Sequence, residues 1–318
     1  MRIMVTGGAG FIGSHVVNRY IELGHEVAVV DDLSTGREAN LNPRARFFRE
    51  DICSPQLAAV FGEFRPEIVN HHAAQVNVRR SVEDPVHDAS VNILGSINVF
   101  RCAGESGCQK VIYASSGGAM YGEPERIPAD EDTPVRPLCP YGCSKYAAEK
   151  YLFLFADLYG FRATTLRYAN VYGPRQDPHG EAGVVAIFSE TMLAGKRPSI
   201  FGDGSKTRDY VFVGDVVEAN VLALETGDGR SYNVGTGRRT SDDEIFEAVR
   251  RAVGSEVRPI YTDFRPGEVR HIALDSSRIA REMGWSARTP LEEGVPVAVE
   301  YYRAKAGGRP ASARKCES

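Results

Sequence analysis

A glycine-rich segment near the N-terminus constrains the fold more than any other feature of this sequence. The letters TGGAGFIG occupy residues 6–13, directly after a short apolar run and directly before a helical pattern over 11–23. In this spacing Gly7 permits a tight turn, Gly10 lets the backbone approach a pyrophosphate, and Gly13 lets the helix pack closely on the strand. Because a helix N-terminus presents amide donors and the positive end of a dipole, the segment predicts a dinucleotide-phosphate site.

Two acidic residues end the next apolar run. Asp31 and Asp32 follow Val27-Ala28-Val29-Val30, about 20 residues after the glycines. A carboxylate here accepts hydrogen bonds from both ribose hydroxyls and repels a 2′-phosphate, so this pair predicts NAD rather than NADP. Asp51 and Ile52 follow a third strand-like segment, and two interpretations stay open for Asp51: it flanks the adenine, or it caps a helix.

Short apolar runs alternate with longer helical patterns through the first half of the chain. Such runs, separated by helices, are typical of a parallel sheet with helical crossovers. We therefore expect an α/β protein with a Rossmann-type doubly wound parallel sheet and a smaller mixed α/β C-terminal lobe. The sheet should occupy residues 1–170, with a return around 210–237, the lobe 171–306 and a flexible tail 307–318.

Composition excludes several classes of protein. The chain has 38 basic and 42 acidic residues, a net charge of −4, which argues against a nucleic-acid partner. It contains no apolar run of about 18 residues, so we expect no membrane span. The N-terminus lacks a signal-peptide pattern, and the six cysteines form no Cys-x-x-Cys pair. We expect free thiols, no metal site and a cytoplasmic location.

A tyrosine and a lysine four residues apart form the candidate catalytic pair. Tyr141 and Lys145 open a helix, so both side chains lie on one face. A free tyrosine has a pKa of about 10. A nearby ammonium and a nicotinamide cation both favour the phenolate and lower that pKa. Tyr141 is then able to take a proton from a sugar hydroxyl as hydride leaves.

The helix expected from about Cys143 to Tyr159 has little polar surface. Two interpretations stay open. The helix packs in the core under the sheet, or one of its faces meets another subunit.

Nine motifs together resemble the extended short-chain dehydrogenase/reductases, in particular the UDP-glucose 4-epimerases, from Met1 to about Tyr302. They are TGGAGFIGSH (6–15), VVDDLSTG (29–36), HHAAQ (71–75), YASSGGAMYG (113–122), PYGCSK (140–145), RYANVYGPRQ (167–176), TRDYVFVGD (207–215), YNVGTG (232–237) and RPGE (265–268).

The resemblance implies a UDP-sugar 4-epimerase with tightly bound NAD. Tyr141 would remove the O4 proton while hydride passes to NAD, and a 4-keto sugar would rotate before hydride returns to its other face. Lys145 would bind the nicotinamide ribose, and the helices at about 91–104 and 143–159 would form the four-helix bundle of a homodimer. The residues implied for the cofactor are Gly7, Gly10, Phe11, Ile12, Gly13, Asp31, Asp32, Asp51, Ile52, Ala73, Ala74, Asn92, Tyr141, Lys145 and Tyr168. Those implied for the UDP-sugar are Ser116, Asn170, Val184, Arg208, Arg265, Glu268 and Ile272.

The sequence departs from the family at one catalytic position. The family places Ser or Thr four residues before the tyrosine of the pair Tyr121-Gly122, and here that residue is Gly117. We expect Ser116, rather than Ser115, to donate the hydrogen bond to the sugar O4. The alternative is that both serines only stabilise the end of a strand.

Ile272 bears on the choice of sugar. Some epimerases carry at the matching position a tyrosine that narrows the hexose pocket. Isoleucine predicts room beside C2, and hence turnover of UDP-N-acetylglucosamine as well as UDP-glucose and UDP-galactose. The other interpretation is that Ile272 packs in the core of the smaller lobe.

Three further functions stay open as alternatives. A 4,6-dehydratase needs an extra acid and base, where this chain has Gly118-Ala119. A UDP-glucuronate 4-epimerase shares the motifs. A non-catalytic NAD sensor would share the fold without needing Tyr141 and Lys145 in register.

Overall fold

The computed structural model describes residues 1–178, 183–264 and 269–307. Its larger part is a seven-stranded sheet in the order β11-β6-β5-β4-β1-β2-β3, and every neighbouring pair is parallel. The strands are β1 (Arg2–Thr6), β2 (Glu26–Val30), β3 (Arg46–Phe48), β4 (Ile68–His71), β5 (Lys110–Ser116), β6 (Arg162–Tyr168) and β11 (Arg230–Val234). This doubly wound parallel sheet confirms the expected fold class.

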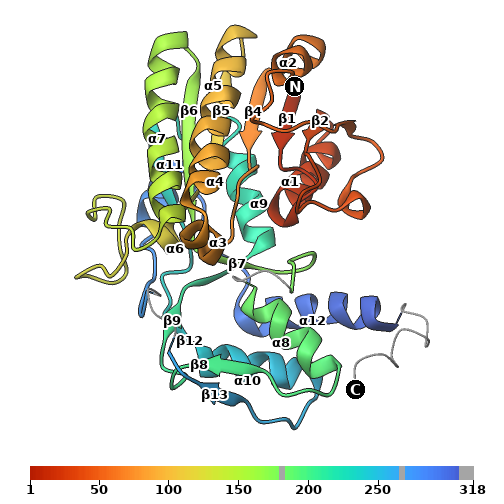
Figure 1. The fold of residues 1–318 in the computed structure, drawn as a ribbon, viewed down its shortest axis with the longest axis vertical. Coiled ribbons are helices and arrows are strands. Elements are labelled where there is room, and N and C mark those ends of the chain that lie inside the picture. The colour runs from red at the N-terminus through yellow and green to blue at the C-terminus, as the bar shows by residue number, and fades with distance from the viewer. Residues whose placement is uncertain (179–182, 265–268, 308–318) are drawn as a thin grey trace.

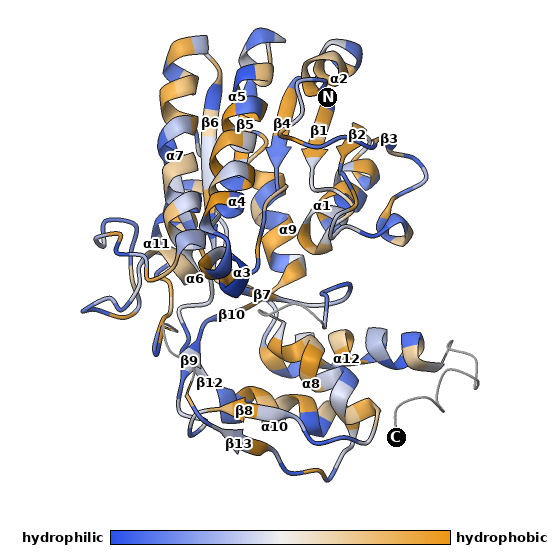
Figure 2. Ribbon diagram, viewed as in Figure 1, coloured by the Kyte–Doolittle hydropathy of each residue, from blue (hydrophilic) through white to orange (hydrophobic). Residues whose placement is uncertain are grey.

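Helices cover both faces of the sheet because its strands are apolar on both sides (Figure 1). Met4 packs with α2 (Leu57–Phe64), α5 (Ser96–Glu105) and α7 (Pro140–Tyr159). Ile3 and Val5, on alternate positions of the same strand, belong to the other core. That core includes α1 (Phe11–Glu22), α9 (Val213–Leu222) and α11 (Ser277–Met283). Figure 2 shows the hydrophobic colour on β1 and α9.

One long helical run crosses the first face and contains a π-helical turn. It comprises α4 (Pro85–Ala89), the turn η2 (Ser90–Gly95) and α5. α3 (Val78–Glu83) precedes it, and α6 (Gly117–Met120) follows β5. π-helical turns occur often at functional sites. Among the described residues, no helix is long and apolar enough to cross a membrane.

A smaller lobe lies beyond the carboxyl ends of the central strands (Figure 1). Its strands form three pairs: β7 (Asn170–Tyr172) with β10 (Tyr210–Phe212), β9 (Thr207–Arg208) with β12 (Thr240–Ser241), and β8 (Ser199–Phe201) with β13 (Ile260–Thr262). The helices α8 (Val184–Leu193), α10 (Asp242–Val253) and α12 (Leu291–Gly307) enclose a separate core that includes Phe188, Ile245 and Val299.

Candidate active site at the carboxyl ends of the sheet

The candidate residues gather where the strand order of the sheet reverses. β1 lies between β2 and β4, and Thr6, His71, Ser116 and Tyr168 end their respective strands at the same edge. In open α/β sheets, ligands bind outside the carboxyl ends of the strands at this point. The topology therefore brings motifs from distant parts of the chain to one edge.

The glycine turn after β1 has no room for side chains. Gly7 has a φ of +69°, and a Cβ there would lie 2.6 Å from the backbone nitrogen of Ala73. A Cβ at Gly13 would lie 2.3 Å from the carbonyl oxygen of Gly7. The turn thus packs its backbone directly against the start of α1, where Phe11 and Ile12 follow, and against the HHAAQ loop with Ala73 and Ala74.

Asp31 and Asp32, the acidic residues expected near the adenosine, differ in their burial and in their hydrogen-bond partners. Asp31 is buried, and its two carboxylate oxygens accept hydrogen bonds at 2.9 Å from the backbone amides of Ala9 and Leu33. Burial raises its pKa, which these hydrogen bonds oppose. Asp32 is exposed and accepts hydrogen bonds from the amide and hydroxyl of Ser34. Each oxygen of Asp31 has a second lone pair for a ribose hydroxyl.

Asp51 and Ile52 lie in the loop after β3. The carboxylate of Asp51 accepts from the amide of Cys53 at 2.8 Å, so it caps a local turn; α2 begins only at Leu57. The Ile52 side chain is buried and packs against Gly95 of the π-helical turn.

Tyr141, Lys145 and Ser116 meet at the start of α7. Tyr141 is the second residue of that helix, and Lys145 follows one turn later. The Ser116 hydroxyl interacts with the Tyr141 phenol and lowers its pKa. Lys145 is 3% exposed, and its ammonium lies 4.3 Å from the ring centroid of Tyr113. By contrast, the hydroxyl of Ser115 is buried without a hydrogen-bond partner.

Burial controls the pKa of both catalytic candidates. It raises the pKa of Tyr141 to about 12, and the hydrogen bond from Ser116 opposes the shift. It lowers the pKa of Lys145 to about 7, against the carboxylates of Glu149 and Asp88. Within the protein, the Ser116 hydroxyl is thus the group that lowers the pKa of Tyr141, where the sequence pattern alone pointed to Lys145.

Asn92 and Tyr168 have their polar groups bound within the protein. The Asn92 amide oxygen accepts from the Gln75 amide at 2.8 Å, and its nitrogen donates to the Gln75 carbonyl at 2.9 Å. The Tyr168 hydroxyl pairs with the amide of Asn220, and its ring stacks on His72 at 6.2 Å. Both residues therefore shape the site, through the loop after β4, as well as bordering it.

Residues from the smaller lobe face this edge. Asn170 begins β7, and its side-chain oxygen lies 3.3 Å from the position of a Cβ at Gly118. Arg208 ends β9, with its guanidinium donating to the Thr207 and Arg270 carbonyls. Val184 begins α8 and is half-buried. Arg265 and Glu268 lie outside the described residues.

Ile272 is 1% exposed and belongs to the core cluster that also contains Leu274. Its side chain has almost no accessible surface in this structure. A contribution to sugar specificity stays a prediction. The burial favours a packing role for this residue, but in the core on the α9 face of the sheet and not in the separate core of the smaller lobe.

The structure explains why glycine replaces a hydroxyl residue at position 117. A Cβ on Gly117 would lie 2.4 Å from a methyl carbon of Leu274. Leu274 is held there by Asp209, whose carboxylate accepts its amide at 3.1 Å. Asp209 also accepts the amides of Thr236 and Gly237. The sequence shows Asp209 inside the TRDYVFVGD motif, but no local signal distinguishes this link between the lobe and the end of β11.

The site fits NAD in its backbone and its charge. A Cβ at Gly7 or Gly13 would collide with neighbouring backbone, and this glycine turn leads directly into the N-terminus of α1, where the first amides of a helix suit a pyrophosphate. Among the described residues, no hydrogen-bond acceptor or carboxylate directly pairs with the buried ammonium of Lys145. Such an orphaned cation suits the diol of a ribose.

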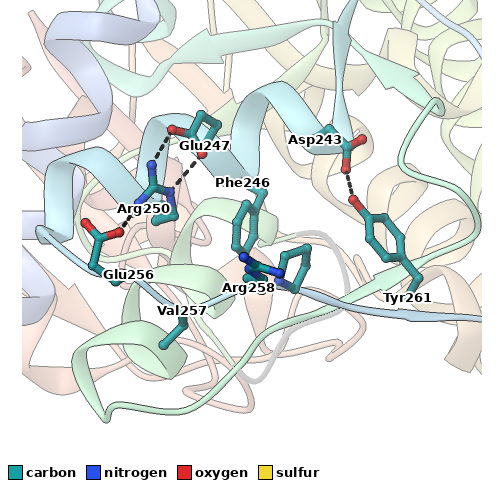
Figure 3. A pocket seen from close by; sticks show the side chains of 9 residues that line it. Asp243, Phe246, Glu247, Arg250, Glu256, Val257, Arg258 and Tyr261 are labelled. Atoms are coloured by element: carbon teal, nitrogen blue, oxygen red, sulfur yellow. Dashed lines mark hydrogen bonds and ion pairs between the residues drawn. The ribbon is translucent and has the colours of Figure 1, made fainter.

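A pocket in the smaller lobe offers a contrast (Figure 3). It lies between α10 and the segment leading into β13. Arg250 pairs with Glu247 at 2.7 Å and with Glu256 at 3.3 Å, and Tyr261 donates to Asp243 at 2.9 Å. These groups satisfy one another, so they carry no candidate chemistry. In the described part of the chain, no cluster of His, Cys, Asp or Glu could hold a metal ion.

Known proteins resemble this chain over nearly its whole length. Residues 3–235 match the NAD dependent epimerase/dehydratase family. The UDP-glucose 4-epimerase of Mycolicibacterium smegmatis is 47% identical over 311 residues, covering 96% of this chain and 99% of that protein. The crystal structure of the Thermotoga maritima UDP-glucose 4-epimerase with UDP-glucose has a TM-score of 0.94 at 48% identity, covering 96% of this chain and 100% of the other. The structure of the Thermus thermophilus UDP-glucose 4-epimerase complex with NAD has a TM-score of 0.91 at 45% identity, covering 95% and 99%.

Proposed function

This chain belongs to the NAD-dependent epimerase/dehydratase family, and from that premise we propose that it is a UDP-glucose 4-epimerase that interconverts UDP-glucose and UDP-galactose. The observation that carries the proposal is the convergence of Ser116 and Tyr141, with Lys145 one helical turn further on, at the sheet edge from which the glycine turn also leads. Bound NAD accepts hydride from C4 of the sugar and returns it, so the net redox change is zero.

The protein's own groups manage the proton at O4. Tyr141 takes that proton and later returns it, which requires its phenolate. Ser116 hydrogen-bonds to the phenolate and helps to hold the sugar oxygen. Lys145 supplies a buried positive charge beside the cofactor ribose. Because burial, opposed by Ser116, raises the pKa of Tyr141 to about 12, the positive charges of Lys145 and of the bound nicotinamide would have to lower it for catalysis at neutral pH.

The residues after Ser116 argue against a 4,6-dehydratase. That reaction needs an acid and a base to eliminate water. The helix α6, Gly117–Met120, contains two glycines, an alanine and a methionine, and none of these side chains transfers a proton. The end of β5 therefore supplies groups for proton transfer at the sugar O4 but no acid–base pair for the elimination of water.

The smaller lobe is the proposed UDP-binding part. Asn170 and Arg208 would hold the pyrophosphate, Arg265 and Glu268 the uridine diphosphate, and Val184 would border the uracil. In this proposal residues 1–170 bind NAD together with the returning segment around 210–237, and 171–306 bind the substrate. β11 of the central sheet, Arg230–Val234, supports the assigned return.

The proposed assembly is a homodimer formed by the α5 and α7 faces. Exposed apolar side chains lie on α7, with Leu154 at 51% and Leu158 at 67%, and on the π-helical turn that leads into α5, with Leu94 at 61%. Contiguous apolar surface of this kind marks interaction sites. The five free cysteines of the described residues suit a reducing cytoplasm, the proposed location.

Product analysis by NMR over a panel of UDP-sugars tests the activity. We expect UDP-glucose and UDP-galactose to reach the same equilibrium mixture from either side, without added NAD and after desalting. A protein that keeps NAD but converts no UDP-sugar would be a sensor instead, and release of a 4-keto-6-deoxy product would indicate a dehydratase.

A further inference from the structure

A buried carboxylate behind the catalytic helix has no role in the reaction described so far. Asp88 lies in α4 and is 1% exposed. Its Oδ1 accepts hydrogen bonds from Gln75 Nε2 at 2.9 Å and from Asn92 Nδ2 at 3.1 Å. Its Oδ2 has no hydrogen-bond partner. Because an incompletely paired buried carboxylate is costly, its retention at this place needs an explanation.

A continuous chain of hydrogen bonds joins Asp88 to the start of α7. Asn92 Nδ2 donates to the Ser144 hydroxyl at 3.1 Å, and that hydroxyl donates to the backbone carbonyl of Tyr141 at 3.1 Å. Asp88, Ser144 and Cys139 also line one pocket. The carboxylate is thus anchored to the turn of helix that carries both Tyr141 and Lys145.

The charged and titratable groups around this turn come from α7 itself and from four elements packed near it. Glu149 is engaged by a buried ion pair with Arg167 of β6, at 2.8 Å. The others are Cys139 at the N-cap of α7, Asp88 of α4, Tyr113 of β5, and His71 and His72 at the end of β4. Burial and the Lys145 charge lower the pKa of both histidines, so these stay neutral. Asp88 is therefore the carboxylate near the pair that no cation directly neutralises among the described residues.

We propose that Asp88 is a positioning residue that sets the charge of the Tyr141–Lys145 pair, acting through the negative charge of its bare carboxylate. The proposal rests on the proposed epimerase function. A negative charge here keeps Lys145 protonated at neutral pH, against its burial. The same charge disfavours the Tyr141 phenolate. The Asp88 carboxylate therefore raises the pKa of both Lys145 and Tyr141.

Asp88→Asn isolates the charge from the hydrogen bonds. The amide oxygen can accept from Gln75 and Asn92, while the amide nitrogen replaces an oxygen that has no partner. In the NAD-loaded enzyme, we expect both limbs of the kcat/KM profile against pH to move to lower pH by about one unit. Asp215→Asn is the matched control, because Asp215 is a buried carboxylate in α9 that accepts from Thr289.

Two further variants separate charge from structure. Ser144→Ala cuts the hydrogen-bonded link but keeps the charge, and should leave both limbs in place. Ala89→Lys brings a cation to the rim of the same pocket, and should move both limbs to lower pH by a smaller amount. The latter variant tests the proposal even where Asp88→Asn does not fold.

A readout without turnover completes the test. Phenolate absorbance during a pH titration, taken as the difference between each protein and its Tyr141→Phe counterpart, reports Tyr141 directly. We expect its midpoint to fall in Asp88→Asn and to stay put in Asp215→Asn. Two results in Asp88→Asn would overturn the proposal. One is a kcat/KM profile whose maximum falls but whose limbs stay at the same pH, and the other is a phenolate midpoint that does not move. Failure of the wild type to convert UDP-sugars would instead reject the epimerase function, since the titration needs no substrate.

Discussion

Tyr141 is the residue whose hydroxyl the proposed chemistry needs. Tyr141→Phe should retain the fold and the bound NAD but lower kcat by about 10²–10⁴-fold, the usual contribution of a general acid–base group. Tyr146→Phe, on the next turn of α7, is the control and should keep normal activity. A near wild-type kcat in Tyr141→Phe would remove Tyr141 from the role of base.

The two serines at the end of β5 differ in their surroundings. Ser116 lowers the pKa of Tyr141, whereas the hydroxyl of Ser115 is buried without a partner. Ser116→Ala should therefore lower kcat and move the acid limb of the pH profile to higher pH. Ser115→Ala should leave kcat unchanged and not destabilise the protein, since it removes an unsatisfied polar group. A greater loss of kcat in Ser115→Ala would reverse the assignment.

Ile272 distinguishes sugar selection from core packing. In its buried site a tyrosine overfills the core, at a cost of about 1–3 kcal/mol. If the residue limits the sugar pocket, Ile272→Tyr instead retains its melting temperature and loses turnover of UDP-N-acetylglucosamine while sparing UDP-glucose. Comparing melting temperature and kcat/KM for both substrates decides this. No UDP-N-acetylglucosamine turnover by the wild type would refute the wide-pocket hypothesis.

At the scale of elements, the sequence of α7 left two interpretations open: packing in the core, or contact with another subunit. One face, including Lys145, Ala148 and Leu152, is buried against the sheet. Leu154 and Leu158 lie on exposed positions of the same helix. A helix with apolar residues on most faces is thus both a core element and a candidate subunit contact.

Charge on the exposed face of α7 tests the proposed dimer. Leu154→Glu with Leu158→Glu should convert a dimer to monomer in sedimentation velocity, because desolvating two carboxylates in an apolar contact is unfavourable. Val297→Glu, at an exposed apolar position of α12, is the control and should not change the mass. A wild-type protein that sediments as a monomer would contradict the proposal.

At the scale of the whole molecule, Lys145 links the site to stability. Burial lowers its pKa from the ordinary value near 10.5 to about 7. Between those values the unfolded chain binds more protons than the folded protein, so the free energy of unfolding should rise with pH from about 7 to about 10 through this group. Lys145→Met removes this contribution. Urea denaturation of the NAD-free proteins across this range should show a less positive slope for the variant, and equal slopes would show that the lysine is solvated.

The sequence by itself determined the doubly wound fold, the NAD cofactor and the Tyr141–Lys145 pair. These depend on local rules: glycines at a strand-to-helix turn, an acid after the next strand, and four-residue spacing on a helix. Each rule involves residues of only one or two neighbouring elements, so the sequence alone is enough to apply it. The family resemblance added roles for more residues. It also showed that Gly117 departs from the family pattern, but it gave no reason for the glycine.

Only the tertiary structure decided what lies between these elements. Leu274, more than 150 positions away, occupies the space where Gly117 would need a side chain, and Asp209 holds it there. Asp88 reaches Tyr141 through Asn92 and Ser144, across two helical segments, α4 with η2 and the start of α7, that no local spacing rule connects to each other. Burial and hydrogen bonding depend on which distant residues the fold brings into contact, and for that reason they set the pKa values and the steric limits of the site.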